Sequence, residues 1–91
     1  MDAVVRCRAI VRGRVQGVWY RASAAREAAR LGVAGSAANR ADGAVELVLE
    51  GPRGAVDEML RWAGDGPPNA RVSAIEVTDE PVAGLTRFDT A

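Results

Sequence analysis

The sequence predicts an α+β protein in which two helices cover one face of an antiparallel sheet of four to five strands. Several short segments alternate hydrophobic and polar residues, as half-buried strands do. Two other segments place hydrophobic residues three and four positions apart, which is typical of helices. The chain has 91 residues, 48% hydrophobic and 26% charged, and chains of this length rarely divide into two cores. We therefore expect residues 1–91 to form a single domain.

A glycine-containing loop joins the first predicted strand to the first predicted helix. Residues 3–12 place small hydrophobic side chains at the odd positions and arginines at three of the even ones, which predicts a strand with one buried face. Residues 21–32 repeat alanine and leucine on one face and close on Gly32, which suits a helix C-terminus. The loop between them covers residues 13–20.

A hairpin and a second helix follow. Asp42-Gly43 is a tight-turn signal between a weak, alanine-rich strand over 33–40 and an alternating strand over 45–50, and this pattern predicts a hairpin. Gly51-Pro52 opens the second helix with proline near its first position. We expect that helix to end at Gly64.

Two short strands complete the predicted sheet. Residues 71–78 and 85–90 supply them, and Pro81 and Gly84 turn the chain between them. The resulting order is the ferredoxin-like, or split βαβ, arrangement. We expect a ferredoxin-like βαββαβ sandwich.

The composition excludes several kinds of chemistry. The sequence has no His and one Cys, so imidazole proton transfer, imidazole metal ligands and an internal disulfide are excluded. We interpret Cys7 as a small buried strand residue and expect no metal and no cofactor. No hydrophobic run approaches the roughly 18 residues of a membrane span, and the N-terminus lacks a signal-peptide core. A cytoplasmic protein without membrane contact is therefore expected.

The net charge of zero hides an uneven distribution. Residues 1–40 carry eight Arg against two acidic residues, a surplus of six, whereas residues 41–91 carry four Arg against ten acidic residues, a deficit of six. Two interpretations stay open. The arginines are ordinary solvated charges, or the first half presents positive charge to an anion that a planar guanidinium grips through two hydrogen bonds.

The segment around the first loop is the strongest candidate for a site. A turn that enters a helix aims several backbone N–H groups at one point, and the helix dipole adds positive potential there. Gly13 and Gly17 permit the close backbone approach that such an anion cradle needs. Arg21 lies at the N-terminus of the predicted helix, where it could bind the same anion. The Walker and dinucleotide-binding glycine patterns are absent.

The stretch Gly13-Arg-Val-Gln-Gly-Val-Trp-Tyr-Arg21 resembles the phosphate-binding motif of the acylphosphatase family, Gly-x-Val-Gln-Gly-Val-x-aromatic-Arg. The similarity continues in register along nearly the whole chain, through Asn39-Arg40, Asp42-Gly43 and the stretch from Gly66 to Val72. The family fold is the same βαββαβ sandwich. The resemblance implies hydrolysis of acyl phosphates to a carboxylate and inorganic phosphate, without metal, cofactor or covalent intermediate, by a monomer.

The same resemblance implies roles for individual residues. The phosphoryl group is expected on the loop, with Arg21 and the backbone amides as its ligands, and Asn39 is expected to hold the attacking water. The implied phosphate-binding residues are Arg14, Val15, Gln16, Gly17, Val18, Trp19, Tyr20 and Arg21. We interpret Tyr20 as a packing residue and leave the role of Trp19 open. By residue type alone, Asn39 is a polar residue that ends a strand beside a turn.

Two departures from the family pattern and two alternatives remain. The family usually has Gly-Trp-Val where this chain has Gly35-Ser36-Ala37, so we expect a more loosely packed second strand. The C-terminal stretch, which in some members helps to hold the arginine, also differs at 88–91. A non-catalytic anion-binding module of the same fold is the main alternative. RNA binding requires exposed aromatics on the central strands, and residues 3–12 carry none, so no nucleic-acid partner is expected.

Overall fold

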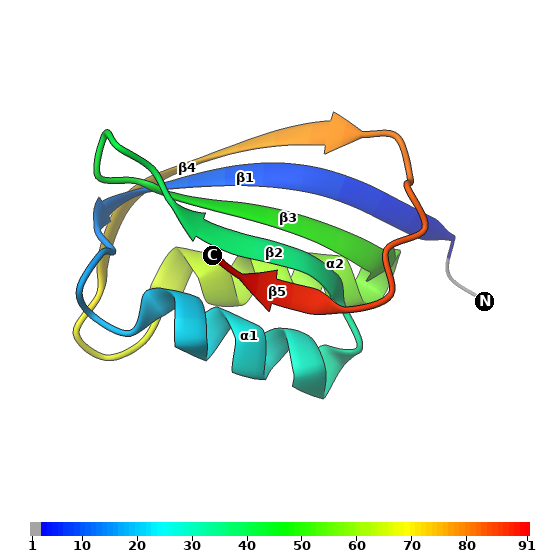
Figure 1. The fold of residues 1–91 in the computed structure, drawn as a ribbon, viewed down its shortest axis with the longest axis horizontal. Coiled ribbons are helices and arrows are strands. Elements are labelled where there is room, and N and C mark those ends of the chain that lie inside the picture. Colours follow the sequence, from blue (N-terminus) through cyan, green and yellow to red (C-terminus); the bar gives the residue numbers. More distant parts are fainter. Residues whose placement is uncertain (1–2) are drawn as a thin grey trace.

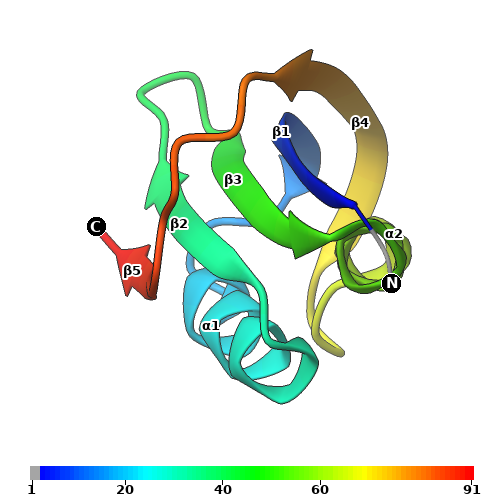
Figure 2. The same cartoon turned by 90° about the vertical axis from the view of Figure 1, so that its right-hand side faces the viewer.

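The computed structural model describes residues 3–91, which form one five-stranded sheet with two helices packed on one face (Figures 1 and 2). The strands lie side by side in the order β4-β1-β3-β2-β5. The elements follow one another as β1 (Val4–Arg14), α1 (Tyr20–Leu31), β2 (Ala34–Asn39), β3 (Val45–Pro52), α2 (Arg53–Asp65), β4 (Arg71–Glu80) and β5 (Phe88–Thr90). The predicted ferredoxin-like α+β fold is confirmed.

The core lies between the sheet and the two helices, where the predicted hydrophobic faces meet. On β1 the inward side chains of Cys7, Ala9 and Val11 are buried, and on α1 those of Ala24 and Ala28 are fully buried. Because alanine side chains are small, the backbone of α1 can approach the sheet closely, and the core is filled without large side chains at these positions. The interpretation of Cys7 as a buried strand residue is confirmed, and burial raises the pKa of its thiol.

The second helix ends later than the sequence predicts. Gly64 lies inside α2, where a side chain would meet only the end of Ile75. The helix instead ends at Asp65, and its C-cap is Gly66, which has a φ of 68° and whose amide donates to the Trp62 carbonyl oxygen at 2.7 Å. The expectation that Gly64 ends the helix is therefore wrong, because the glycine that caps it comes two positions later.

The alanine-rich β2 pairs with β3 along its whole length. The register runs from Ala34 opposite Glu50 to Asn39 opposite Val45, and Ala37 is fully buried. The expected looser packing thus does not extend to the backbone ladder. Full pairing places Asn39 at the last position of the strand, beside the β2–β3 turn.

The last strand corrects the expectation of a wholly antiparallel sheet. β5 pairs with β2 in parallel, with Gly35 opposite Phe88 and Ala37 opposite Thr90. The chain leaves β4 at one edge of the sheet and crosses to the other edge before β5 begins (Figures 1 and 2). Residues 85–87, predicted as strand, belong to this crossing, which covers residues 81–87 and is called the strap below.

A buried carboxylate holds the strap against the sheet. Glu50 on β3 is 3% exposed; its Oε1 accepts from the Ala83 amide at 2.8 Å and its Oε2 from the Leu85 amide at 2.7 Å. The Arg6 guanidinium lies 3.8 Å away. These amide bonds, led by that of Ala83 and supported by Arg6, hold the pKa of Glu50 below its usual value. The buried charge of Glu50 is thus stabilised by the amides of the strap, which leads the chain to β5.

Replacing Glu50 tests this anchor. Because its pKa is lower in the folded protein than in the unfolded chain, its contribution to stability is full above the unfolded pKa and disappears as the pH falls through the folded pKa. We expect Glu50→Gln to lower Tm by several degrees at pH 7, and the difference from the parent to shrink below pH 4.5, the ordinary Glu value. Thermal unfolding followed by circular dichroism between pH 3 and 7 measures this. Glu58→Gln, at an exposed carboxylate on α2, is the matched control, and equal Tm losses in both variants would contradict the assignment.

Candidate active site

The loop between β1 and α1 is held to the core by two valines. The side chains of Val15 and Val18 are 1% and 5% exposed. Gly17 lies between them with a φ of 73°, and the space where its side chain would stand is empty for 4 Å. The buried side chains therefore leave the backbone around Gly17 accessible to an incoming group, as the sequence predicts for an anion cradle.

Gly13 is required by the packing of the sheet. It lies at an irregularity in the pairing of β1 with β4 and has a φ of 125°. A side chain there would stand 2.1 Å from the Arg71 carbonyl oxygen. The glycine is required because β4 passes directly over it, and this is a different reason from the close ligand approach expected from the sequence.

Helix α1 begins directly after this loop. Its first residue, Tyr20, is 1% exposed, donates its hydroxyl to the Ala63 carbonyl oxygen at 2.7 Å and packs its ring 5.2 Å from that of Trp62. Burial raises the pKa of this phenol. The interpretation of Tyr20 as a packing residue is confirmed, and the start of α1 is thereby attached to α2.

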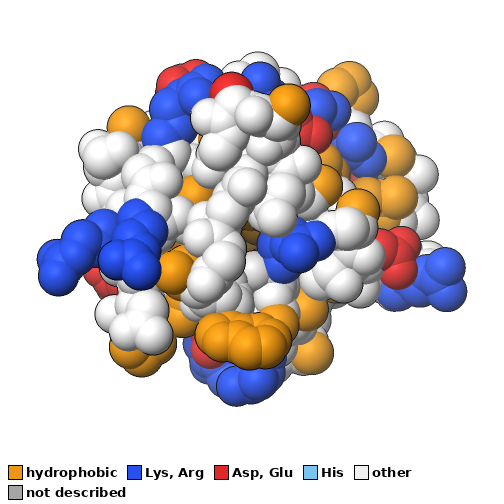
Figure 3. All heavy atoms as spheres, turned by 60° about the vertical axis from the view of Figure 1, so that its left-hand side comes forward, with side chains coloured by type: hydrophobic (Ala, Val, Ile, Leu, Met, Phe, Trp, Pro, Cys, Tyr) orange, Lys and Arg blue, Asp and Glu red, His pale blue; other side chains and the backbone are white. Residues whose placement is uncertain are grey.

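A cavity of about 230 Å³ opens at this end of the molecule. It brings Arg21 of α1 and Asn39 of β2 together in one space, as the resemblance implies. Figure 3 shows basic and hydrophobic side chains on the surface of this face. The residues that line the cavity are Val15, Gly17, Trp19, Tyr20, Arg21, Ala22, Asn39, Thr90 and Ala91. Of the expected phosphate-binding residues, Arg14, Gln16 and Val18 do not line it.

Thr90 and Ala91 were not named among the expected site residues, although in some members of the resembled family the C-terminal stretch helps to hold the arginine. They reach it because β5 runs parallel to β2 and ends beside the start of α1. The Arg21 Nη1 donates to the backbone oxygen of Ala91. Within residues 3–91, no Asp or Glu side chain pairs with this guanidinium. Arg21 is thus oriented by the backbone oxygen of Ala91, and no acidic side chain of residues 3–91 competes with an anion for it.

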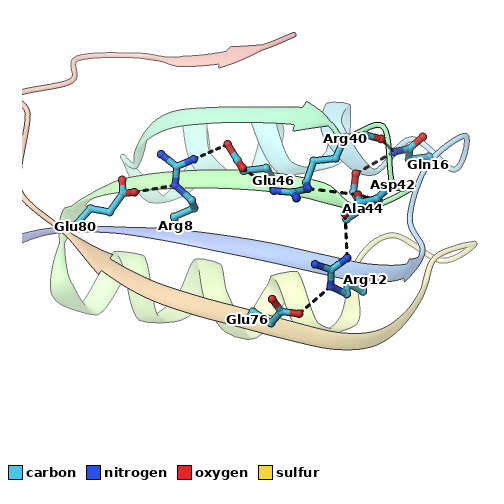
Figure 4. Close-up of polar contacts among 9 residues, drawn as sticks. All are labelled: Arg8, Arg12, Gln16, Arg40, Asp42, Ala44, Glu46, Glu76 and Glu80. Carbon is cyan, nitrogen blue, oxygen red and sulfur yellow. Dashed lines mark hydrogen bonds and ion pairs between the residues drawn. The ribbon is translucent and has the colours of Figure 1, made fainter.

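Gln16 connects the loop to the β2–β3 turn (Figure 4). Its Nε2 donates to the carbonyl oxygens of Arg40 at 2.8 Å and Ala44 at 2.9 Å. Asn39 immediately precedes this turn. The Gln16 side chain thus joins the loop to the segment that carries Asn39.

The charge surplus of the first half is used mainly within the protein. On the open face of the sheet, Arg8 and Arg12 of β1 and Arg40 bind carboxylates from the second half (Figure 4). The pairs are Arg8–Glu80 at 2.7 Å, Arg8–Glu46 at 2.9 Å, Arg12–Glu76 at 2.8 Å, Arg12–Asp42 at 3.2 Å, Arg40–Asp42 at 3.3 Å and Arg40–Glu46 at 3.3 Å. The Ala44 amide, followed by Arg12, lowers the pKa of Asp42 to about 2. Arg8, Arg12 and Arg40 are therefore paired with carboxylates rather than simply solvated.

A larger hollow of about 460 Å³ lies at the other end of α1, near Gly32 and the strap. Its only acidic side chain, Glu50, already accepts the strap amides, so it offers no free anionic group. In the described part of the chain, no three His, Cys, Asp or Glu side chains are grouped to hold a metal ion. Neither α1 nor α2 is long and hydrophobic enough to cross a membrane.

Comparisons with known proteins point to one family. The family model described as Acylphosphatase matches residues 7–90. An acylphosphatase of Rubrobacter xylanophilus is 54% identical over 82 residues, which cover 90% of this chain and 74% of that protein. An acylphosphatase of Methylococcus capsulatus is 53% identical and 91% of each chain is covered. The crystal structure of acylphosphatase from Bacillus subtilis superposes with a TM-score of 0.92 at 38% identity, over 96% of this chain and 98% of that one.

The role of Gln16 can be tested by removing its two hydrogen bonds while keeping its length. Gln16→Met deletes both donors, and one such bond contributes about 0.5–1.5 kcal/mol. We expect a loss of about 1–2 kcal/mol in the free energy of unfolding, measured by urea titration, and several-fold weaker binding of inorganic phosphate, measured by calorimetry. Gln16→Glu, which places a carboxylate against two carbonyl oxygens, should weaken both more. Unchanged phosphate binding in both variants would show that the loop does not need this connection.

Proposed function

Because this chain belongs to the acylphosphatase family, whose activity it shares, we propose the residues that carry the reaction. Acyl phosphate is hydrolysed to a carboxylate and inorganic phosphate. In our proposal the loop over 15–19 and the start of α1 bind the phosphoryl group, Arg21 neutralises its charge and Asn39 orients the water. The observation that carries this is the shared cavity of Arg21 and Asn39.

The backbone at the start of α1 supplies the first part of the binding site. The Ser23 amide donates to the Trp19 carbonyl oxygen at 3.0 Å, and this is the first bond of the helix. The amides of residues 20–22 therefore have no helical partner and point out of the helix end. Together with the helix dipole they favour a phosphoryl group there.

Arg21 supplies the positive side chain of the site. In phosphoryl transfer, charge spreads over the three equatorial oxygens, and a positioned guanidinium stabilises that charge. The backbone oxygen of Ala91 fixes the orientation of Arg21. Donors that are fixed before the reaction need no rearrangement during it.

Asn39 is suited to hold the nucleophile. Its amide has both a donor and an acceptor, so it can orient a water molecule without taking its proton. The water oxygen forms the new bond to phosphorus while the acyl oxygen leaves with the electron pair of the broken bond, and the proton passes to the phosphate. Alignment of this kind is the main contribution that a neutral side chain makes to such a reaction.

The leaving group explains why a chain without histidine suffices. A carboxylic acid with a pKa near 4 leaves as its anion at neutral pH, so no general acid is needed. We therefore infer that the reaction uses no metal and no cofactor. We also infer that the chain acts as a cytoplasmic monomer. We infer no nucleic-acid partner, because arginine–carboxylate pairs occupy the open sheet face where RNA-binding sheets carry aromatic side chains.

Substitution of Arg21 tests the phosphoryl-binding role. We expect Arg21→Ala to lower kcat/KM for benzoyl phosphate by about 10³- to 10⁵-fold, the range that arginine contacts supply in other phosphoryl-transfer enzymes. The assay follows loss of absorbance in excess EDTA, with inorganic phosphate as a competitive inhibitor. Arg26→Ala, at an exposed position on the same helix, is the control.

The same assay separates the enzyme from a non-catalytic module. Tight phosphate binding by the parent without turnover in EDTA would favour the anion-binding module. An Arg21→Ala variant that retains the parent rate would remove Arg21 from the mechanism.

Substitution of Asn39 distinguishes water orientation from binding. We expect Asn39→Ala to lower kcat by about 10²-fold, since a misplaced reacting group costs that much, while inorganic phosphate keeps its inhibition constant within a few-fold. Steady-state kinetics with phosphate as inhibitor measure both. Asn39→Asp, which keeps the size but adds a negative charge, should also weaken phosphate binding. If Asn39→Ala changes phosphate affinity and leaves kcat intact, the residue binds the phosphoryl group instead.

A further inference from the structure

Among residues 3–91, Trp19 is the most exposed of the large hydrophobic side chains. It is 79% exposed, whereas its neighbour Tyr20 is 1% exposed. The other large hydrophobic side chains exposed among residues 3–91 are aliphatic and do not line the cavity: Val4, Val77, Val82 and Leu85. Packing in the core therefore does not explain why an indole stands at this position.

The local backbone does not explain it either. Trp19 has a φ of 66° and a ψ of 22°, and among residues 3–91 it is the one non-glycine residue with positive φ. A large side chain is disfavoured in this conformation. Trp19 also precedes the first turn of α1, a position that favours Ser, Thr, Asp or Asn, and its side chain makes no capping hydrogen bond. Strain of this kind is concentrated at ligand sites.

The location of Trp19 suggests what the indole contacts. It lines the same cavity as Arg21 and Asn39. A single oxygen separates the phosphorus of an acyl phosphate from its acyl carbon. A phosphoryl group held at the start of α1 therefore brings the acyl group to the rim of the cavity.

We propose that Trp19 is a specificity-determining residue whose indole binds the acyl group of the substrate. The proposal rests on the phosphoryl-binding role given above to the same cavity. A flat aromatic acyl group can pack face to face with an offset, or edge to face, against the indole, whereas an acetyl group offers little surface. The site thus favours aromatic acyl phosphates over short aliphatic ones.

The proposal predicts a change in substrate preference. The acyl group is not altered in the rate-limiting bond change, so its contact with Trp19 stabilises ground state and transition state alike and is expressed in KM. We expect Trp19→Ala to lower the ratio of kcat/KM for benzoyl phosphate to that for acetyl phosphate by about three- to tenfold, through KM. Trp19→Phe keeps an aromatic ring and should hold the ratio within about twofold. Initial rates of phosphate release with both substrates give the ratio.

Controls separate this result from a general defect. Leu85→Ala removes an exposed hydrophobic side chain at the far end of α1 and should leave the ratio unchanged. Equal losses for both substrates in Trp19→Ala would overturn the proposal and show that position 19 serves only the phosphate loop. Failure of Arg21→Ala to lose activity would instead overturn the proposed phosphoryl site, whatever the ratio does.

Fluorescence gives a test that does not depend on turnover. The chain has two tryptophans, and Trp62→Phe leaves Trp19 as the only indole. We expect benzylphosphonate to change the emission of this variant in a saturable manner, and methylphosphonate at saturation to change it far less. Identical responses to the two phosphonates, or no response to either, would contradict contact between the indole and the acyl side of the ligand. The ratio of kcat/KM does not require this variant, so poor folding of Trp62→Phe leaves the test in place.

Discussion

The turn from β1 into α1 is the constraint on which the rest of the site depends. Burial of Val15 and Val18 gives this loop one position relative to the core, so its polar backbone faces the cavity. The Tyr20 hydroxyl then attaches the start of α1 to α2. Hydrophobic packing therefore sets the position of the amides, although no hydrophobic group takes part in the proposed chemistry. Gln16 adds the β2–β3 turn to the same unit through two hydrogen bonds.

Much of the fold follows from hydrophobic periodicity, and the proposed site follows from one motif. The alternation in residues 3–12 and the turn at Asp42-Gly43 predict β1 and the hairpin correctly, because one buried face leaves a period of two in the sequence. The parallel pairing of β5 was not predictable in this way. Three residues are too few to show a period, and their direction depends on where the strap crosses.

The strap is held by hydrogen bonds from its amides to Glu50, and the sequence pattern does not predict this contact. Glu50 occupies a strand position that reads as solvent-facing, yet it is buried because the amides of Ala83 and Leu85 close over it. In a side chain–backbone hydrogen bond any residue can supply the backbone group, so the sequence does not indicate which residue the side chain will meet. Ala91 was missed as a site residue for the same reason, since it contributes a backbone oxygen to Arg21.

The contrast between Arg21 and the arginines of the open face explains how a chain of zero net charge can present a cation. Arg8 and Arg12 each bind two carboxylates, so their charge is compensated before any ligand arrives. An Asp or Glu side chain paired with Arg21 would add a negative charge that repels a phosphoryl group at close range. Among residues 3–91 no such side chain pairs with Arg21, and the backbone oxygen of Ala91 orients it. The acidic second half of the chain thus neutralises the arginines of the open face, while the strap and β5 bring a backbone oxygen to the arginine that lines the cavity.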